Sequence, residues 1–402
     1  MRTTFAIVLS PGVSLVRNTL HMQRTVGIAA PAGVALTPDD FAFHAMRPYD
    51  RCCGGQTAPP IDISSQGNSG LETLIRAAAL TNFLEVSRDL GLDPQPLLRQ
   101  ARLRRAWLDD PDQRVPVSAC VALLEAAAQA SACPTFGLRM AESRQLSDFG
   151  VMSLLISQQP TLRAALATTI RYRHLVNDSV ALLLEDAGSA VVIRQEVLSD
   201  APSRQATELA IGVVFRMCAL LLGPRWQPIG VSFTHAAPAD LRIHRRLFGC
   251  PLEFNADSNG IICRAADLDA PNPTADPVMA RYAQQFIDTL PRANPQSIGH
   301  EVRAAIYLML PMGRATCEAV AEGLGLSLRT MQRQLDDAGE TFTEILNDVR
   351  RELARRYVEN PRYSLLRVSQ LLGYGSASSF TRWFSAQFGM APANWRRDHA
   401  AG

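Results

Sequence analysis

One short pattern of residues occurs twice near the C-terminal end of the chain, and it restricts the possible folds more than any other feature. Each copy has a Val, then a Leu-Gly pair, then a hydrophobic residue, an Arg and a second hydrophobic residue. These positions are Val320, Leu324, Gly325, Met331, Arg333 and Leu335 in the first copy, and Val368, Leu372, Gly373, Phe380, Arg382 and Phe384 in the second. A duplicated pattern predicts a duplicated structural unit.

Each copy predicts two short helices joined by a tight turn. The Gly after the first helix can adopt the left-handed conformation that a tight exit needs. Ser327 and Ser376 follow at positions where a hydroxyl can cap the second helix. In that second helix the two hydrophobic residues lie four positions apart and therefore face the core. A single such pattern also fits an ordinary helical hairpin, but two copies with matched spacing predict tandem helix-turn-helix motifs.

The remaining faces of the two second helices carry side chains suited to DNA, because in the major groove Arg pairs with guanine and Gln with adenine. The candidate base contacts are Arg329, Gln332 and Arg333 in the first helix, and Ala377, Ser378, Ser379 and Arg382 in the second. The candidate contacts to the DNA backbone are Ser327, Ser376, Thr381, Arg350 and Arg351. The small side chains of the second set predict weaker base discrimination there, with a role mainly in positioning.

A third helix is predicted between the two copies. Ile345, Val349, Leu353 and Tyr357 recur every four residues and form one hydrophobic stripe from Glu344 to Val358. Such a helix would fix the separation of the two reading helices. If both enter the same side of one duplex, they should lie about one helical turn apart, roughly 34 Å.

The second copy and the residues after it resemble the DNA-binding domain of AraC/XylS-type transcription regulators. The residues that carry this resemblance are Gly373, Tyr374, Phe380, Arg382, Phe384, Phe388, Gly389, Ala391 and Pro392. The resemblance implies an all-α DNA-binding domain over residues 298–397, with two helix-turn-helix motifs joined by a linker helix. It also implies promoter DNA and RNA polymerase as partners of a bacterial, cytoplasmic regulator.

Upstream, residues 71–268 predict an α+β domain with helices over a small antiparallel sheet. We expect an amphipathic helix from Leu71 to Gly91 and a long hydrophobic helix from Arg204 to Leu222. One hairpin is predicted from 180–185 and 190–198, and another from 252–255 and 261–264, both around turn residues. Residues 269–297 predict a linker that contains a helix from Pro277 to Thr289. Met1 to Gly70 lacks sustained periodicity, which predicts a disordered extension.

The 71–268 segment resembles, more loosely, the N-terminal regulatory domain that one AraC-type subfamily shares with ornithine-utilisation regulators, called an arabinose-binding domain. The residues are Phe149-Gly150, Pro160-Thr161-Leu162, Tyr172-Arg173 and Phe248-Gly249-Cys250-Pro251. The resemblance implies a small-molecule effector but does not identify it. Arg171, Tyr172 and His174, beside Arg173 at a predicted helix end, are candidates for an anionic effector. Cations at a helix C-terminus also have a purely structural explanation.

The composition and the absence of catalytic motifs argue against two other classes of function, an architectural DNA binder and an enzyme. The net charge is only +2, which argues against an architectural DNA binder without a ligand. The eight Cys residues form no CxxC pair, and no GxSxG, HExxH or P-loop motif occurs, so we expect neither metal nor cofactor and no enzymatic activity. A DNA-repair or hydrolase enzyme with an appended DNA-binding domain remains the alternative from another class. No membrane span is expected, and a homodimer is left open.

Overall fold

The computed structural model describes residues 73–199, 201, 203–290 and 297–399, together with the backbone of two short strands, β1 (Thr3–Ala6) and β2 (Val16–Asn18). The prediction of disorder for the rest of residues 1–70 lies outside the described residues. Strand β1 pairs antiparallel with β5 at the edge of the main sheet.

The main sheet has the strand order β2-β1-β5-β6-β9-β7-β8. Besides β1 and β2, the sheet contains β5 (Val180–Ala187), β6 (Ala190–Val197), β7 (Gly230–Phe233), β8 (Leu252–Phe254) and β9 (Asn259–Arg264). Strands β5 and β6 form the predicted hairpin, with Gly188 at a positive φ of 72° in the turn. Every neighbouring pair is antiparallel except β7 and β8. The predicted α+β class with an antiparallel sheet is thus confirmed.

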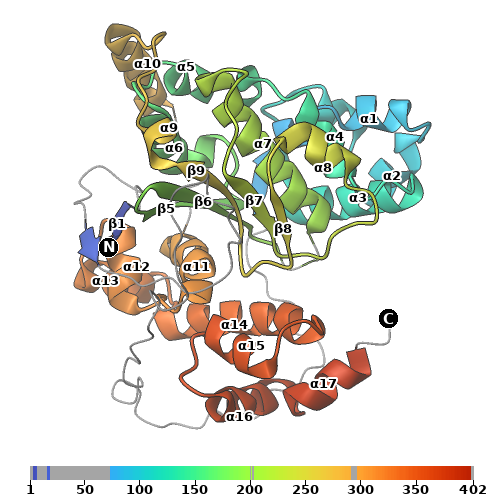
Figure 1. Ribbon diagram of the computed structural model, residues 1–402, viewed down its shortest axis with the longest axis vertical. Helices are drawn as coiled ribbons and strands as arrows, with labels where there is room; N and C mark the ends of the chain where they lie inside the picture. Colours follow the sequence, from blue (N-terminus) through green and yellow to red (C-terminus); the bar gives the residue numbers. More distant parts are fainter. Residues whose placement is uncertain are drawn as a thin grey trace, which may run out of the picture.

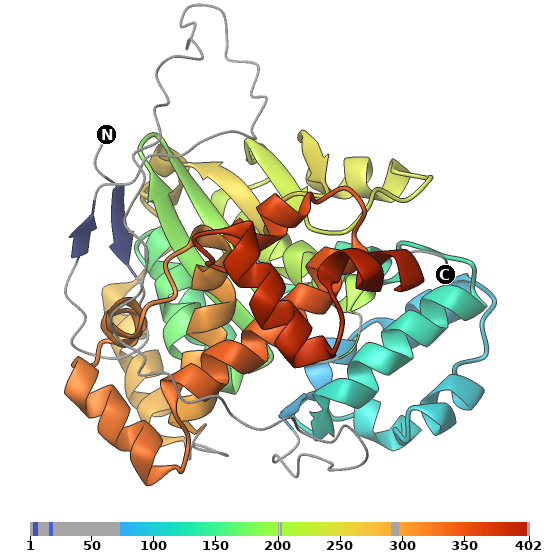
Figure 2. The same cartoon turned by 90° about the horizontal axis from the view of Figure 1, so that it is seen from below.

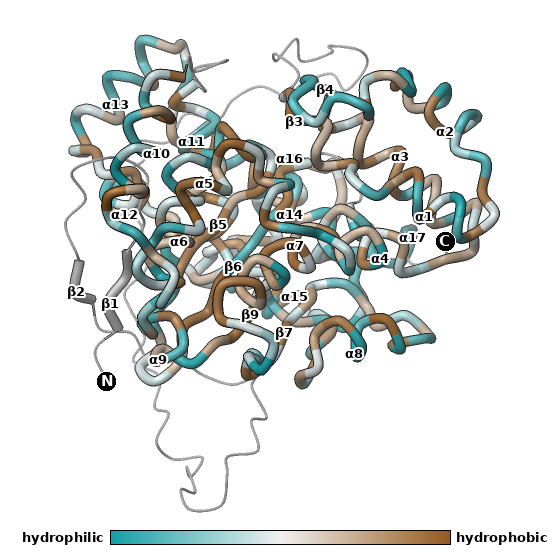
Figure 3. The backbone as a smooth tube through the Cα atoms, turned by 90° about the horizontal axis from the view of Figure 1, so that it is seen from above, coloured by the Kyte–Doolittle hydropathy of each residue, from teal (hydrophilic) through white to brown (hydrophobic). Residues whose placement is uncertain are grey.

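The N-terminal part also contains helices. They are α1 (Phe83–Asp89), α2 (Pro94–Gln100), α3 (Val117–Ala130), α4 (Phe136–Glu142), α5 (Met152–Ile156), α6 (Leu162–Arg171), α7 (Arg204–Leu222), α8 (Arg242–Phe248), α9 (Ala265–Leu268) and α10 (Pro277–Thr289). Of these, α6, α7 and α9 pack on the strands of this sheet. Helix α7 crosses the sheet, and its hydrophobic length alone would suffice for a membrane span. More than half of it is buried, as expected for a core helix. In Figure 3 the hydrophobic stretches gather around the central strands.

The single helix predicted from Leu71 to Gly91 is wrong in its first half. Residues there form β3 (Leu74–Arg76), a 3₁₀ helix η2 (Ala77–Leu80) and only then α1. Strand β3 pairs with β4 (Arg114–Pro116), and Ile75 lies opposite Val115. Hydrogen bonds to a partner far away in the sequence therefore override the local helical periodicity, as tertiary context often does.

The second predicted hairpin is also wrong. Strand β8 does not pair with β9, because β7 lies between them and pairs with both. The residues before β9 do turn the chain, but the strand that follows pairs with β7 and not with β8. Sequence proximity favoured the hairpin, whereas the sheet order places a strand from earlier in the chain at that position.

The C-terminal part is all helical and contains two helix-turn-helix units. The first has α11 (Ile298–Met309), α12 (Cys317–Gly323) and α13 (Leu328–Asp337), and the second has α15 (Leu365–Leu371), α16 (Ala377–Phe388) and α17 (Pro392–His399). The predicted connecting helix is α14 (Phe342–Glu359), whose residues Ile345, Val349, Leu353 and Tyr357 are all buried. Figure 2, viewed from below, shows the orange first unit and the red second unit in front of the sheet.

The helical part packs against the face of the sheet that α6 and α7 leave uncovered (Figure 1). Helix α11 contacts β5 and β6, and the Arg173 guanidinium forms an ion pair of 2.5 Å with Glu301 on α11. From the second unit, the Tyr363 hydroxyl donates a hydrogen bond of 2.8 Å to the Ala256 carbonyl. Arg356 of α14 pairs with Glu196 of β6 at 2.7 Å. The sheet thus joins the two parts of the molecule.

Candidate DNA interface and effector cavity

Helix α13 separates its hydrophobic and polar residues between two faces. The Ser327 hydroxyl caps it by accepting a hydrogen bond of 3.1 Å from the Thr330 amide, as predicted. Met331 and Leu335 are fully buried in the helical core. The three predicted base contacts of this helix, Arg329, Gln332 and Arg333, are all exposed to solvent.

Helix α16 repeats this arrangement. The Ser376 hydroxyl accepts a hydrogen bond of 3.1 Å from the Ser379 amide. Phe380 and Phe384 are fully buried, while Ser378 and Arg382 are exposed. The other predicted contacts of this helix, Ala377, Ser379 and Thr381, are partly exposed. Both Arg333 and Arg382 are therefore accessible, as insertion into a groove requires, and their contacts to DNA remain predictions.

The turns before the two helices have the predicted backbone conformation. Gly325 and Gly373 have φ values of 67° and 74°, in the left-handed region that costs most other residues energy. Each turn reverses the chain directly before the capping Ser. The local sequence was therefore sufficient to place both reading helices.

An aromatic cluster supports α16. The ring centroids of Phe384 and Phe388 lie 4.3 Å apart, and Trp395 packs on both rings at 5.9 and 5.1 Å. Trp383 lies against Tyr374 at 5.5 Å. Both Trp residues are partly buried against the helical core, and the cluster supports α16 by contacts between several rings.

The arginines of α14 hold neighbouring elements together. The Arg350 Nε donates a hydrogen bond of 3.1 Å to the Leu372 carbonyl, and its guanidinium lies 4.8 Å from the Tyr374 ring centroid. Arg351 donates a hydrogen bond of 3.1 Å to Gln387 and pairs with Asp348. These contacts join α14 to the second unit. Contacts of Arg350 and Arg351 to the DNA backbone stay a prediction.

Of the three effector candidates, Tyr172 contacts α10. The Tyr172 hydroxyl donates a hydrogen bond of 3.1 Å to Asp288 on α10 and contacts Gln284. The Arg171 guanidinium lies 5.1 Å from the Tyr172 ring centroid, and the His174 ring lies 6.2 Å from it. This cluster attaches α10 to the end of α6. Effector binding by Arg171, Tyr172 and His174 remains untested.

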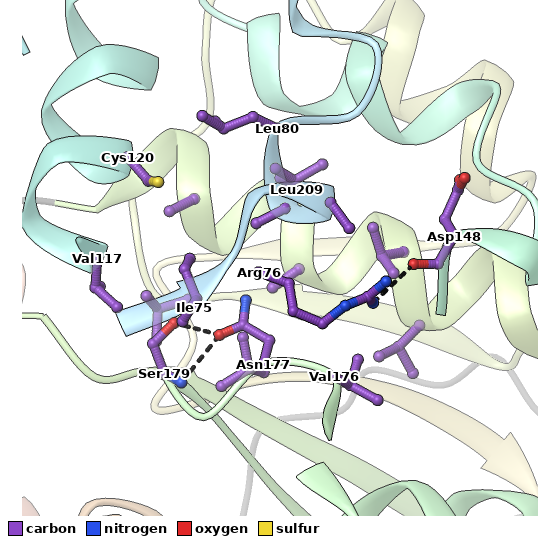
Figure 4. A pocket seen from close by; sticks show the side chains of 18 of the residues that line it. Ile75, Arg76, Leu80, Val117, Cys120, Asp148, Val176, Asn177, Ser179 and Leu209 are labelled. Carbon is purple, nitrogen blue, oxygen red and sulfur yellow. Dashed lines mark hydrogen bonds between the residues drawn. The ribbon is translucent and has the colours of Figure 1, made fainter. Parts of the chain in front are cut away.

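A cavity of about 130 Å³ lies between the β3–η2 segment, α3, α7 and the start of β5, and we call it the inner cavity. Most of its wall is aliphatic, and the labelled side chains in Figure 4 surround it. Its charged wall residues are Arg76, Arg144, Asp148 and Arg173. Apolar pockets with a few convergent polar groups are typical of small-molecule sites. Arg76 escaped the sequence reasoning because its segment was assigned to a helix.

The three arginines of the inner cavity are only 4–8% exposed. The Arg76 Nε pairs with Asp112 at 2.7 Å, and its Nη1 donates a hydrogen bond of 3.3 Å to the Asp148 carbonyl (Figure 4). Arg144 donates hydrogen bonds of 2.6 and 2.7 Å to the carbonyls of Ala78 and Ala79. Burial and, to a smaller extent, the Arg76 charge lower the pKa of Arg144 to about 10, against the attraction of Asp148.

Comparison with known proteins agrees with both parts of the chain. The arabinose-binding domain of AraC transcription regulators matches residues 91–272, and a helix-turn-helix domain matches residues 320–398. The chain is similar to the HTH-type transcriptional regulator VirS of Mycobacterium tuberculosis, with 28% identity over 81% of this chain and 97% of that protein. It is also similar to the ornithine utilization regulator of Pseudomonas aeruginosa, with 24% identity over 80% of this chain and 96% of that protein.

The solved structure of the transcriptional regulator CdpR from Pseudomonas aeruginosa covers 78% of this chain and 98% of its own, with 19% identity and a TM-score of 0.36. At this TM-score the likeness carries no conclusion of its own. The two domain matches and the regulators that align along most of their length point the same way. The chain belongs to the AraC-type transcription regulators that carry an N-terminal domain of the arabinose-binding type.

Proposed function

We propose that this regulator reads two successive major-groove segments of promoter DNA with α13 and α16, and that a small-molecule effector in the N-terminal domain controls this reading. The observation that carries the DNA contacts is the division of each helix into a buried hydrophobic face and an exposed face with Arg333 or Arg382. An exposed Arg on a capped helix can reach a guanine edge or a phosphate.

The contact between sheet and helical part supports control by an effector. Ion pairs and hydrogen bonds from β6, the β5 entry and the Ala256 turn hold both helix-turn-helix units against the N-terminal domain. An effector shifts the population that is competent for DNA only if it binds one arrangement more tightly than the other. A ligand that alters the contacts between this sheet and the helical part would meet this condition.

The test is a footprint of the full chain on DNA from around its own coding region. We expect protection of one short asymmetric site, with two protected segments about one helical turn apart. Uniform protection of any sequence, with a steep salt dependence, would contradict specific reading and favour an architectural binder. Failure to bind any DNA would overturn the proposal.

The enzymatic alternative gains no support from the cysteines of the described residues. Alkyl transfer needs an activated thiolate, hence a lowered pKa. Burial instead raises the pKa of Cys120, Cys250 and Cys263 to about 12, and raises that of Cys218 and Cys317. We therefore propose that the protein is a regulator without enzymatic activity.

We also propose that it is located in the cytoplasm and contacts RNA polymerase at the promoter. Whether it binds DNA as a homodimer can be tested by sedimentation.

A further inference from the structure

The inner cavity has a wall of two different chemistries. Its aliphatic part comes from β3, η2, α3, β5, β6 and α7 and can hold a hydrocarbon body; it includes Ile75, Leu80, Val117, Leu124, Leu209 and Val214. The Ser179 hydroxyl donates a hydrogen bond of 2.7 Å to the side-chain carbonyl oxygen of Asn177, as Figure 4 shows. They are thus already occupied within the wall.

The charged part of the wall favours an anion. Three arginines and one carboxylate, Asp148, line the cavity, while Asp112 pairs with Arg76 from a largely exposed position. Among the described residues, the buried Nε atoms of Arg144 and Arg173 have no hydrogen-bond partner. A buried guanidinium with an open donor gains most from a carboxylate, which can accept two hydrogen bonds at once.

Two other ligand classes fit this wall poorly. A sugar would bury several hydroxyl groups against aliphatic side chains that offer no hydrogen bonds, which is unfavourable. A cationic amino acid would place further hydrogen-bond donors against the open Nε donors of Arg144 and Arg173, which need an acceptor. A hydrocarbon body with a negatively charged head satisfies both parts of the wall.

We propose that the inner cavity binds an amphiphilic carboxylate, with its hydrocarbon body against the aliphatic wall and its head group on the arginines, Arg173 foremost. This names the effector class and so rests on the proposed function. Arg173 is singled out because it lies on the wall of the inner cavity and also on that of a small gap against α11. Its guanidinium reaches Glu301 across the domain contact at 2.5 Å.

This double position links the cavity to the DNA-binding part. A ligand carboxylate and the Glu301 carboxylate compete for the same guanidinium. Binding therefore weakens the ion pair that holds α11 on the sheet, and α11 belongs to the first helix-turn-helix unit. A neutral ligand of the same shape fills the cavity without this competition.

The experiment is calorimetric titration of the full chain, without DNA, with decanoate kept below its micelle-forming range. Comparison ligands are 1-decanol, with the same body and no charge, decyltrimethylammonium, L-ornithine and L-arabinose. We expect decanoate to bind about tenfold more tightly than decanol, the gain of a charge-assisted hydrogen-bond pair. Equal affinity for both, or tighter binding of ornithine or arabinose, overturns the proposal. This comparison of ligands uses only the unmodified protein, so its outcome does not depend on the folding of any variant.

Four variants locate the site. Arg173→Gln should weaken decanoate binding about tenfold and leave decanol unchanged. Its matched control is Arg225→Gln, at an exposed position outside the wall of the inner cavity, which should bind decanoate like the unmodified chain. Ala210→Phe, at a half-buried position on the cavity wall, should abolish binding of both ligands. Glu301→Gln removes the competing carboxylate and should tighten decanoate binding about threefold. Unchanged binding in Ala210→Phe would place the ligand elsewhere and overturn the proposal.

Footprints with and without decanoate separate this inference from the proposed function. A specific footprint together with absence of decanoate binding defeats the ligand class alone. Decanoate binding that follows the variants but leaves the footprint unchanged upholds the ligand class and defeats effector control.

Discussion

The two helix-turn-helix units share one backbone plan but differ in the chemistry of both faces. The first has an aliphatic core with Val320, Leu324, Met331 and Leu335, and it presents long polar side chains to solvent. The second is built on an aromatic cluster around Phe384 and presents mainly small residues beside Arg382. This difference predicts that the first unit discriminates bases and that the second mainly positions the protein on the duplex.

The units also differ in how they contact the N-terminal domain. The first is attached through α11, by the Glu301 ion pair and by a hydrogen bond of 3.2 Å between the His300 ring and the Asp178 carbonyl. The second is attached through Tyr363, whose hydroxyl is bonded to Ala256, and through an ion pair of Arg367 with Asp257. The contact of the first unit includes Arg173, a residue of the inner cavity wall.

The largest expected effect is on the core of the second unit. Phe384→Ala should lower the free energy of unfolding by about 3–5 kcal/mol, because it removes a fully buried ring that contacts three other aromatic residues. Met331→Ala, the matched change in the first unit, should cost about 2–5 kcal/mol, toward the lower end. Denaturant unfolding followed by circular dichroism measures both. A larger loss for Met331→Ala would refute the aromatic cluster as the firmer support.

The reading faces should differ next. Arg333→Ala should weaken specific DNA binding by about 1–3 kcal/mol and relax preference at one base position. Ser378→Ala, at an exposed position of α16, should cost less than about 0.5 kcal/mol. Gel-shift titrations on the footprinted site and on base-substituted sites measure both. Arg362→Ala, outside both reading helices, is the control; a loss equal to that of Arg333→Ala would indicate a general charge effect instead of base reading.

Docking of the second unit should respond to a single hydroxyl. Tyr363→Phe removes the buried hydrogen bond to the Ala256 carbonyl and should cost about 1 kcal/mol. Protection of this interface can be followed by hydrogen exchange and by limited proteolysis. Tyr282→Phe makes the same chemical change at an exposed position of α10 and should have no effect. Equal hydrogen exchange in Tyr363→Phe and Tyr282→Phe would mean that the Tyr363 hydroxyl does not hold the second unit on the N-terminal domain.

The smallest effect is a pH dependence of the contact of the first unit. Burial foremost, opposed by the bond to Asp178 and by the Glu301 charge, lowers the pKa of His300 below its ordinary value of 6.5, and the Arg173 charge adds to the shift. The docked state then binds fewer protons than the undocked state, so docking is strongest above pH 6.5 and weakens as pH falls below it. Unfolding midpoints at pH 7.5 and 5.5 should differ less in His300→Gln than in the unmodified chain. The same difference in both would assign the pH dependence to other groups, such as the partly buried His235, whose pKa is also lowered, mainly by burial.

The DNA-binding part could be predicted in detail because its signals are local. The capping Ser residues, the left-handed glycines and the four-residue hydrophobic spacing act within one or two helical turns. Helix α10 and the β5–β6 hairpin were predicted for the same reason, since a Pro at the helix start and a tight Asp-Ala-Gly-Ser turn mark their ends. Elements whose partners are neighbours in sequence leave their signature there.

The effector side could not be predicted in this way. Residues 71–91 show a helical period, yet Ile75 and Arg76 lie in a strand because β4 pairs with them. At the end of α6, sequence reasoning proposed Arg171, Tyr172 and His174 as effector contacts; the Tyr172 hydroxyl is bonded to Asp288 on α10, whereas the neighbouring Arg173 lines the inner cavity. Which side chain of such a segment points into a cavity depends on the packing of elements that are distant in sequence.

The sequence by itself determined the tandem reading helices, their caps, the linker helix and the family resemblance, since these rest on interactions within a few residues. Only the tertiary structure decided the strand order around β7, the inner cavity with Arg76, Arg144 and Arg173, and the docking of the helical part on the sheet. Those features depend on backbone pairing and side-chain burial between segments far apart in the chain, and no local periodicity records them.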